Sequence, residues 1–302
     1  MTWFFIALIA PTCWAASNFI DKYLLSKYFV GIKPETLVIV SSLIGILIIP
    51  FIAIFVPGIW QAGFLNSIIL IISGILYMLA LFPYLYALRD EDVSGITAIF
   101  QTIPIFSYIL GFIFLQEVLN SQQIIAALLI IFGAIGISLD LNAKKFKIKI
   151  KPFLLMLLSS FLLAGGYFLF KFVTIIDNYW VSNFWLYLGI LVPAMLMLLF
   201  SKTYRQDFFK LVQKHKIVLI SLNLVNEILD VIGKMTMTFA VLLAPLSLAL
   251  VVNGFQPLLA LGYGIILTIF FPKIIKEDIS KKIILQKIIF IIIMIIGGYL
   301  LN

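Results

Sequence analysis

Apolar residues form long runs along this chain, and short gaps between the runs hold most of the charges. A helix needs about 20 apolar residues to cross the hydrocarbon layer, and its backbone groups must all be bonded within the segment. We expect ten membrane-spanning helices, at residues 2–20, 35–56, 65–88, 93–115, 122–139, 152–173, 180–200, 216–242, 246–270 and 283–301.

The composition supports the same class of protein. The 302 residues are 64% hydrophobic and 11% charged, whereas soluble domains average about 45–50% apolar and about 25% charged residues. No gap is long enough for an attached soluble enzyme. We therefore predict an all-α integral membrane protein, with the lipid bilayer as its surroundings and the bacterial cytoplasmic membrane as its expected location.

The basic residues predict an orientation in the membrane. The chain has 21 Lys and Arg against 13 Asp and Glu, a net charge of +8, and nearly all of the basic residues lie in or beside the gaps that follow odd-numbered runs. By the positive-inside rule these gaps are cytoplasmic, which places both termini outside. No helix face carries a basic stripe, so nucleic acid is not expected as a partner.

The two halves of the chain resemble each other. The segment 14–22 of the first run lines up with 163–171 of the sixth at an offset of 149, with small residues, Phe and the final Lys in common. Phe100-Gln101 recurs as Phe255-Gln256 at an offset of 155. An offset of 153 instead superposes Pro104 on Pro257, and the sequence leaves both registers open.

This duplication predicts two repeats, residues 1–145 and 146–302, with five helices each. Because five is odd, the second copy enters the membrane upside down. Inverted repeats are the architecture of alternating-access transporters, which bind substrate near the midplane where the halves meet. A duplication kept only for packing is the alternative.

A family resemblance rests on these features. The run Trp14-Ala-Ala-Ser-Asn-Phe-Ile-Asp-Lys22, the proline-bearing fourth helix, Glu117 at its end and the glycines of the fifth helix resemble the drug/metabolite transporter (DMT) superfamily, specifically its EamA-type members. The resemblance implies a ten-helix carrier of small metabolites, with helices 1, 3, 4, 6, 8 and 9 around a central cavity. Leu163 departs from the pattern, since a Trp is expected there.

The eighth run carries a stripe of polar and charged residues. At 100° per residue its members fall within about 100° of one another on the helix surface. An ionisable side chain in the middle of a spanning helix costs at least about 2.5–3.5 kcal/mol, so it is a functional candidate by default. The stripe must face protein or water, and it consists of Asn223, Asn226, Glu227, Asp230 and Lys234.

Two roles are open for the charges of this stripe. Asp230 and Lys234 have the i, i+4 spacing of an intrahelical ion pair, and a purely structural bridge is the favoured interpretation of that pair. Glu227 is then left to bind a cationic group, to take up a proton, or to pair with Lys171 or Lys22. We name Glu227 and Asp230 as candidate coupling residues.

Amides and aromatic rings on other helices complete the candidate binding site. Amides near helix prolines are expected to line a cavity, and aromatic rings beside a carboxylate suit organic cations; the alternative for each ring is an anchor at the membrane interface. Asp21 and Lys22 are interpreted as headgroup-level residues. The candidates outside the eighth run are Trp14, Asn18, Tyr84, Gln101, Tyr108, Asn253 and Gln256.

Motifs for other activities are missing from the sequence. It has no phosphate-binding loop, no metal-ligand spacing and no Ser-His or Cys-His arrangement, so we expect no cofactor, no metal and no catalytic residue. The predicted function is secondary active transport of a small polar, zwitterionic or cationic metabolite, such as an amino acid or amine, by a monomer or weak homodimer with proton coupling or exchange. The alternatives are a carrier of a nucleotide derivative resembling S-adenosylmethionine, an intramembrane enzyme acting on a lipid or isoprenoid headgroup, and a passive channel.

Overall fold

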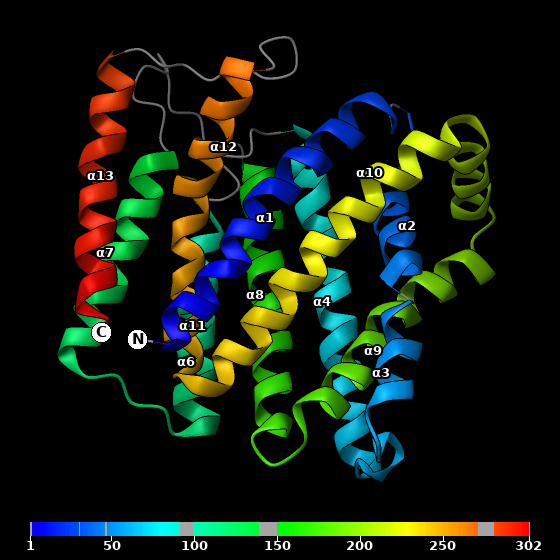
Figure 1. The fold of residues 1–302 in the computed structure, drawn as a ribbon, viewed down its shortest axis with the longest axis horizontal. Helices are drawn as coiled ribbons and strands as arrows, with labels where there is room; N and C mark the ends of the chain where they lie inside the picture. Colours follow the sequence, from blue (N-terminus) through cyan, green and yellow to red (C-terminus); the bar gives the residue numbers. More distant parts are fainter. Residues whose placement is uncertain are drawn as a thin grey trace.

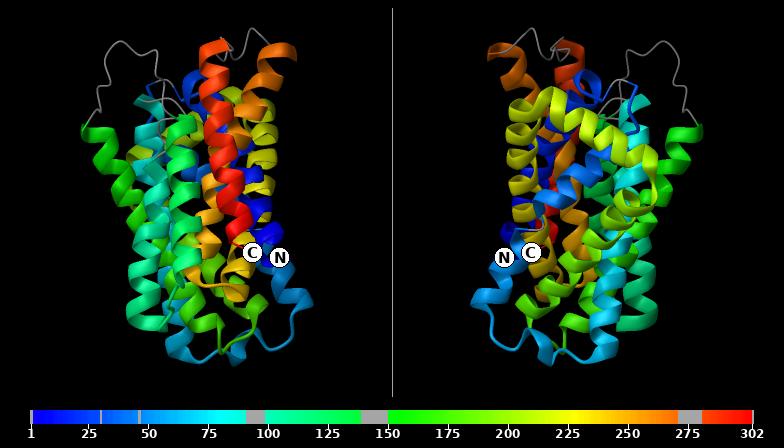
Figure 2. Two further views of the ribbon diagram at one scale, coloured as in Figure 1. Left: turned by 90° about the vertical axis from the view of Figure 1, so that its left-hand side faces the viewer. Right: turned by 90° about the vertical axis from the view of Figure 1, so that its right-hand side faces the viewer.

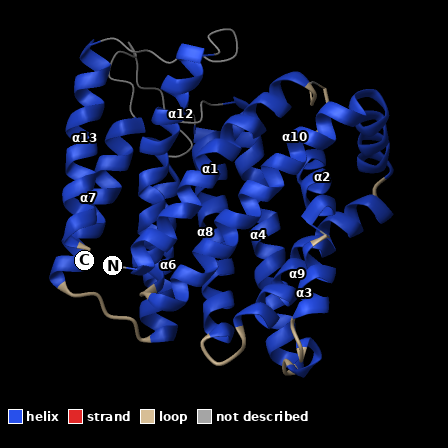
Figure 3. Ribbon diagram, viewed as in Figure 1, coloured by secondary structure: helices blue, strands red, loops and turns tan. Residues whose placement is uncertain are grey.

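The computed structural model describes residues 2–29, 31–45, 47–90, 99–138, 150–270 and 281–301, and this part of the chain contains helices and loops but no strand (Figure 3). The helices are α1 (Thr2–Lys27), α2 (Glu35–Gly45), α3 (Ile48–Phe55), η1 (Ile59–Gln61), α4 (Phe64–Asp90), η2 (Phe100–Thr102), α6 (Ile103–Leu115), α7 (Ser121–Ser138), α8 (Ile150–Thr174), α9 (Tyr179–Phe200), α10 (Lys202–Leu243), α11 (Leu246–Val251), η3 (Val252–Phe255), α12 (Gln256–Phe270) and α13 (Lys281–Leu300).

The longer helices form one bundle, in which α1, α9 and α10 are inclined to α4, α8 and α13 (Figures 1 and 2). The most extensive contacts join α4 to α8 and α9, α1 to α10, and α7 to α13. The α4–α9 contact depends on glycine at two positions. A Cβ atom on Gly74 or Gly189 would overlap the backbone of the opposite helix, so only glycine permits this close approach.

The helices coincide with the apolar runs of the sequence, but several begin or end at other residues than expected. Among the described residues, seven helical segments are long and apolar enough to cross a membrane, by length and composition, and two shorter apolar helices accompany them. The helix α10 is not one of these segments, because its apolar part carries three charged residues, Glu227, Asp230 and Lys234. This helix also begins at Lys202, so the basic gap expected before residue 216 is helical. The expected boundary between residues 145 and 146 lies outside the described residues.

The fourth and ninth runs are interrupted near their prolines. In the fourth, the 3-10 turn η2 precedes α6, which begins at Ile103; in the ninth, η3 precedes α12, which begins at Gln256. Pro104 and Pro257 are each the second residue of the new helix, where a missing N–H costs no hydrogen bond. The two prolines therefore lie at the starts of helices. The first residues of these helices, Ile103 and Gln256, are 153 positions apart, which is the second of the two registers left open by the sequence.

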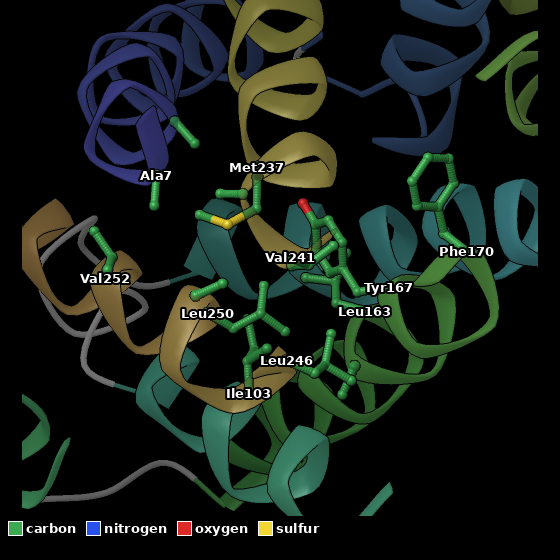
Figure 4. Close-up of a cluster of buried hydrophobic side chains, with 14 of the residues drawn as sticks. Ala7, Ile103, Leu163, Tyr167, Phe170, Met237, Val241, Leu246, Leu250 and Val252 are labelled. Atoms are coloured by element: carbon green, nitrogen blue, oxygen red, sulfur yellow. The ribbon is translucent and has the colours of Figure 1, made fainter. Parts of the chain in front are cut away.

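Apolar side chains close the end of the bundle where the α6–α7 loop, the α8–α9 loop and the start of α11 lie, the lower end in Figure 1. Large parts of one buried cluster come from α1, α8, α10 and α11, as the close-up in Figure 4 shows. Four of its side chains are fully buried: Ala7, Met237, Leu246 and Leu250. Because these apolar side chains have no contact with solvent, the cluster closes this end of the bundle to a polar solute.

Candidate substrate cavity

A cavity lies between α1, α4, α6, α8, α10 and α12. Its volume is about 600 Å³, including the part open to solvent. Ile103 and Leu163 belong both to its wall and to the apolar cluster of Figure 4, so the cluster borders the cavity. The polar and aromatic residues on the wall are Trp14, Ser17, Asn18, Asp21, Tyr77, Tyr84, Phe100, Tyr167, Asp230, Asn253 and Gln256.

Asp230 connects three helices at the cavity wall. Its Oδ1 atom accepts hydrogen bonds from Trp14 Nε1 of α1 at 3.1 Å and from Tyr77 Oη of α4 at 2.9 Å. Its Oδ2 atom is 2.8 Å from Lys234 Nζ, one helical turn further along α10. The predicted intrahelical ion pair is therefore present. The Asp230 side chain is still 21% exposed, because one side of the carboxylate faces the cavity.

Lys234 is deeply buried behind this carboxylate. Its ammonium nitrogen lies 4.1 Å from the centre of the Tyr77 ring and 5.1 Å from that of Tyr187. Ring faces and one carboxylate thus replace the water that the ammonium loses on burial. Lys234 does not line the cavity itself, so its role there is to balance the charge of Asp230.

Asp21 is the second carboxylate of the cavity, and it has no cationic partner within the described residues. Asn226 Nδ2 donates to its Oδ1 atom at 2.7 Å. The single hydroxyl hydrogen of Tyr84 is shared between Asn18 Oδ1 at 2.8 Å and Asp21 Oδ2 at 3.3 Å. Because the shorter bond goes to Asn18, the Oδ2 atom of Asp21 is only weakly satisfied. Interpreting Asp21 as a headgroup-level residue was wrong: it is buried at the site.

Glu227 lines a separate side pocket between α1, α2, α4 and α10, with a volume of about 390 Å³. Its side chain is buried, and within the described part of the chain no donor bonds it and no cation pairs with it. Lys22 donates to the carbonyl oxygen of Leu88. Lys171, the other partner considered from the sequence, is bound at the far end of the bundle to Glu117.

The structure divides the sequence candidates into three groups. Trp14, Asn18, Tyr84, Asp230, Asn253 and Gln256 line the main cavity. Asn226 and Glu227 line the side pocket, while Asn223 is buried beside it and accepts a hydrogen bond from Ser41. Gln101, Tyr108 and Lys234 line neither space.

Tyr108 and Gln101 lie outside both the main cavity and the side pocket. The Tyr108 ring lies 6.1 Å from that of Phe112 on the same helix, away from the cavity. Gln101 is buried against Gly254, at the point where η2 meets η3. Gln101 therefore belongs to the contact between the two interrupted runs.

The sequence contained a signal for Asp21 that the interpretation of the first run did not use. Asp21 follows Ser17 by four residues and Trp14 by seven, and this spacing places all three on one side of a helix. Only the length of α1, which continues to Lys27, shows that Asp21 lies well inside the helix and not at its end.

A second ion pair lies at the closed end. Lys171 Nζ of α8 is 2.5 Å from Glu117 Oε1, in the segment after α6, and also donates to the carbonyl oxygen of Ala244 at 2.6 Å. The other oxygen of Glu117 accepts the backbone N–H of Leu246 at 2.7 Å, at the start of α11. Glu117, from the first half of the chain, is thereby tied to two groups of the second half, the Lys171 ammonium and the backbone N–H of Leu246.

Long apolar helices around a cavity that carries two carboxylates are those of a multi-pass membrane protein. Residues 1–139 match the EamA-like transporter family, which belongs to the DMT superfamily. The resemblance stated from the sequence is confirmed over this part of the chain, and the match suggests a membrane transporter of the DMT type.

Further comparisons concern the fold. A solved structure described as "Crystal structure of protein" is similar over 97% of this chain and 95% of its own, with a TM-score of 0.64 and 13% sequence identity. This likeness shows a shared fold. No curated protein matches the sequence.

Proposed function

We propose that this protein is a secondary active transporter of a small organic metabolite that carries an ammonium group, such as an amine or an amino acid. The observation that carries the proposal is the pairing of Asp21 and Asp230 on the wall of one aromatic-lined cavity. Lys234 balances only one of these two charges. An uncompensated carboxylate is costly in a medium of low polarity, so the cavity favours a cationic guest.

The rest of the wall suits the same class of substrate. The rings of Tyr84 and Phe100 are stacked with their centres 5.6 Å apart, and Trp14 adds a third aromatic surface. Such surfaces attract organic cations through their faces. Asn18 Nδ2 and Asn253 Oδ1 are buried polar atoms without hydrogen-bond partners. They supply a donor and an acceptor for the polar end of a zwitterion.

Alternating access is supported by the packing of the helices. If α1 corresponds to α8 and α4 to α10, as an inverted repeat requires, then the α1–α10 contact corresponds to the α8–α4 contact, and both are extensive. The cavity residues of α1 lie in its C-terminal half, toward the end that the basic residues assign to the cytoplasm. The other end is closed. We therefore interpret this conformation as the inward-facing state.

Transport by purified protein in proteoliposomes tests the proposal. The panel contains amino acids and polyamines as candidates, with S-adenosylmethionine and a lipid headgroup amine for the alternative functions, and the readout is counterflow of labelled substrate. Asp21→Asn is expected to lower the uptake of the transported compound at least about tenfold, since hydrogen bonds to charged groups contribute about 1.5–3 kcal/mol.

Asp177→Asn is the matched control. It is the same change of acid to amide, made at the closed end, where Asp177 accepts a hydrogen bond from Asn66. Its uptake is expected to stay near that of the unmodified protein. Equal uptake by Asp21→Asn and the unmodified protein would reject the ammonium site.

A further inference from the structure

The side pocket differs from the main cavity in what its walls present. Its polar wall consists of Ser17, Asp21, Ser41, Tyr84, Asn226, Glu227 and Asp230, and the remainder is aliphatic. Tyr84 is the one aromatic residue on it, whereas several rings surround the main cavity. The smaller pocket thus lacks the aromatic surfaces that suit an organic cation, and it is rich in oxygen.

The hydrogens of these polar groups are already used inside the protein. The Ser17 hydroxyl donates to Asn226 Oδ1 at 2.7 Å, and the Ser41 hydroxyl donates to Asn223 Oδ1 at 3.0 Å. Asn226 Nδ2 donates to Asp21. With these hydrogens committed, the two hydroxyl oxygens offer only lone pairs to the pocket. A ligand that accepts hydrogen bonds finds no uncommitted hydroxyl hydrogen on Ser17 or Ser41, while a ligand that needs oxygen atoms is well matched.

Charge points to the same kind of guest. Asp21, Glu227 and Asp230 line the pocket, and Lys234 balances Asp230. No Lys or Arg among the described residues lines this pocket. Glu227 is 8% exposed and has neither an ion-pair partner nor a hydrogen-bond donor in the described chain. A carboxylate buried to this extent is stable only when it is protonated or when a cation lies beside it, and Lys234 is already paired with Asp230.

The arrangement also limits the charge of the guest. No group of three or more His, Cys, Asp or Glu side chains among the described residues is placed to hold a metal ion together, so a resident divalent metal is not favoured. When an ammonium group occupies the main cavity beside Asp21, one uncompensated charge remains, on Glu227. A single positive charge would balance it.

We propose that the side pocket binds a monovalent inorganic cation of the sodium type, held by Glu227 together with oxygen atoms of Asp21, Ser17 and Ser41. Oxygen ligands are those that hard cations prefer. The oxygen ligands of the site do not depend on the proposed transport function, whereas the restriction to a single charge and the role as the coupling site rest on it. Asp21 lines both spaces, so an ion in the side pocket and a substrate in the cavity would share one carboxylate.

Ion binding is measured on the full-length protein in nanodiscs, without organic substrate. NaCl replaces choline chloride at constant pH and constant total chloride, and the midpoint of thermal unfolding is recorded. A ligand that binds only the folded state raises this midpoint in a saturable way. We expect a saturable rise with Na⁺, and we expect Glu227→Gln to abolish it.

Glu35→Gln is the matched control for this change. Glu35 is also a buried carboxylate, but it accepts a hydrogen bond from Tyr86 and lies outside the pocket. Its sodium response is expected to be unchanged. Ser41→Ala serves as a second pocket variant should Glu227→Gln fail to fold, and loss of this oxygen is expected to raise the half-saturating Na⁺ concentration about tenfold.

Three results would overturn the sodium site: no Na⁺-specific shift in the unmodified protein, a shift that survives in Glu227→Gln, or a midpoint that responds to pH in choline chloride but not to Na⁺. The last result would assign a proton to the pocket. Because the titration contains no organic substrate, its failure leaves the proposed transport untouched. A sodium response in a protein that transports none of the panel would retain the ion site and reject the transport proposal.

Discussion

The two buried ion pairs of this protein have similar chemistry but different surroundings. At the closed end, Lys171 and Glu117 form a pair whose remaining atoms bind the backbone at Ala244 and Leu246. The charges sum to zero, and each partner is fixed by the chain. Beside the cavity, Lys234 pairs with Asp230, but two further carboxylates on the pocket walls lack a cationic partner within the described residues.

This difference separates structural charge from binding charge. A buried pair with all its lone pairs and hydrogens satisfied needs nothing from solution. A group of three acids and one lysine beside open space has negative charge that only a guest can balance. The presence of buried charge is therefore weaker evidence for a site than an excess of one sign next to a cavity.

The largest loss of stability is expected from removing one partner of the ion pair at the closed end. Lys171→Met leaves the partly buried Glu117 without its ammonium partner, and removal of one member of a buried pair costs up to about 3–5 kcal/mol. We expect a corresponding fall in the free energy of unfolding of the purified protein. The double variant with Glu117→Gln removes both charges and should recover at least half of the loss. A double variant as unstable as Lys171→Met would contradict the structural role.

A smaller loss of stability is expected beside the cavity. Asp230→Asn leaves Lys234 without a carboxylate, but the ammonium keeps its contacts with the Tyr77 and Tyr187 rings and the substituted position borders the cavity. The loss should be about 1–3 kcal/mol. Stabilisation by the transported compound should disappear in Asp230→Asn and persist in Glu117→Gln when both are measured by thermal unfolding. If both variants lose ligand stabilisation equally, the two regions do not differ as described.

The smallest effect concerns a single donor to Asp230. Tyr77→Phe keeps the aromatic ring over Lys234 and removes the hydroxyl that donates at 2.9 Å. Trp14 continues to donate to the same oxygen atom. We expect substrate affinity to fall about fivefold, equivalent to about 1 kcal/mol, in equilibrium binding with labelled ligand.

Tyr179→Phe is the control for this prediction. Its hydroxyl donates to the backbone of Met235 and lies outside the cavity. It should change stability and leave affinity as it was. Unchanged affinity in Tyr77→Phe would show that this donor does not contribute to the binding site.

Part of the site could be predicted from helical periodicity. The stripe from Asn223 to Lys234 is one face of a helix, and its burial follows because charges do not face lipid. The Asp230–Lys234 pair needed only the i, i+4 spacing. The sequence could not predict the partner of Lys171, because Glu117 is 54 positions away and meets it only where the segment after α6 packs against α8.

Apolar runs about as long as the bilayer is thick, together with the spacing of charges along one helix, determined by themselves that this chain is a helical membrane protein with a buried acidic face. The tertiary structure decided which acids share a space. It placed Asp21 and Asp230 on the walls of both spaces and Glu227 on the wall of the side pocket alone. The reason is physical: periodicity fixes which side of a helix a residue occupies, but the packing of several helices fixes what lies opposite that side and where room is left between them.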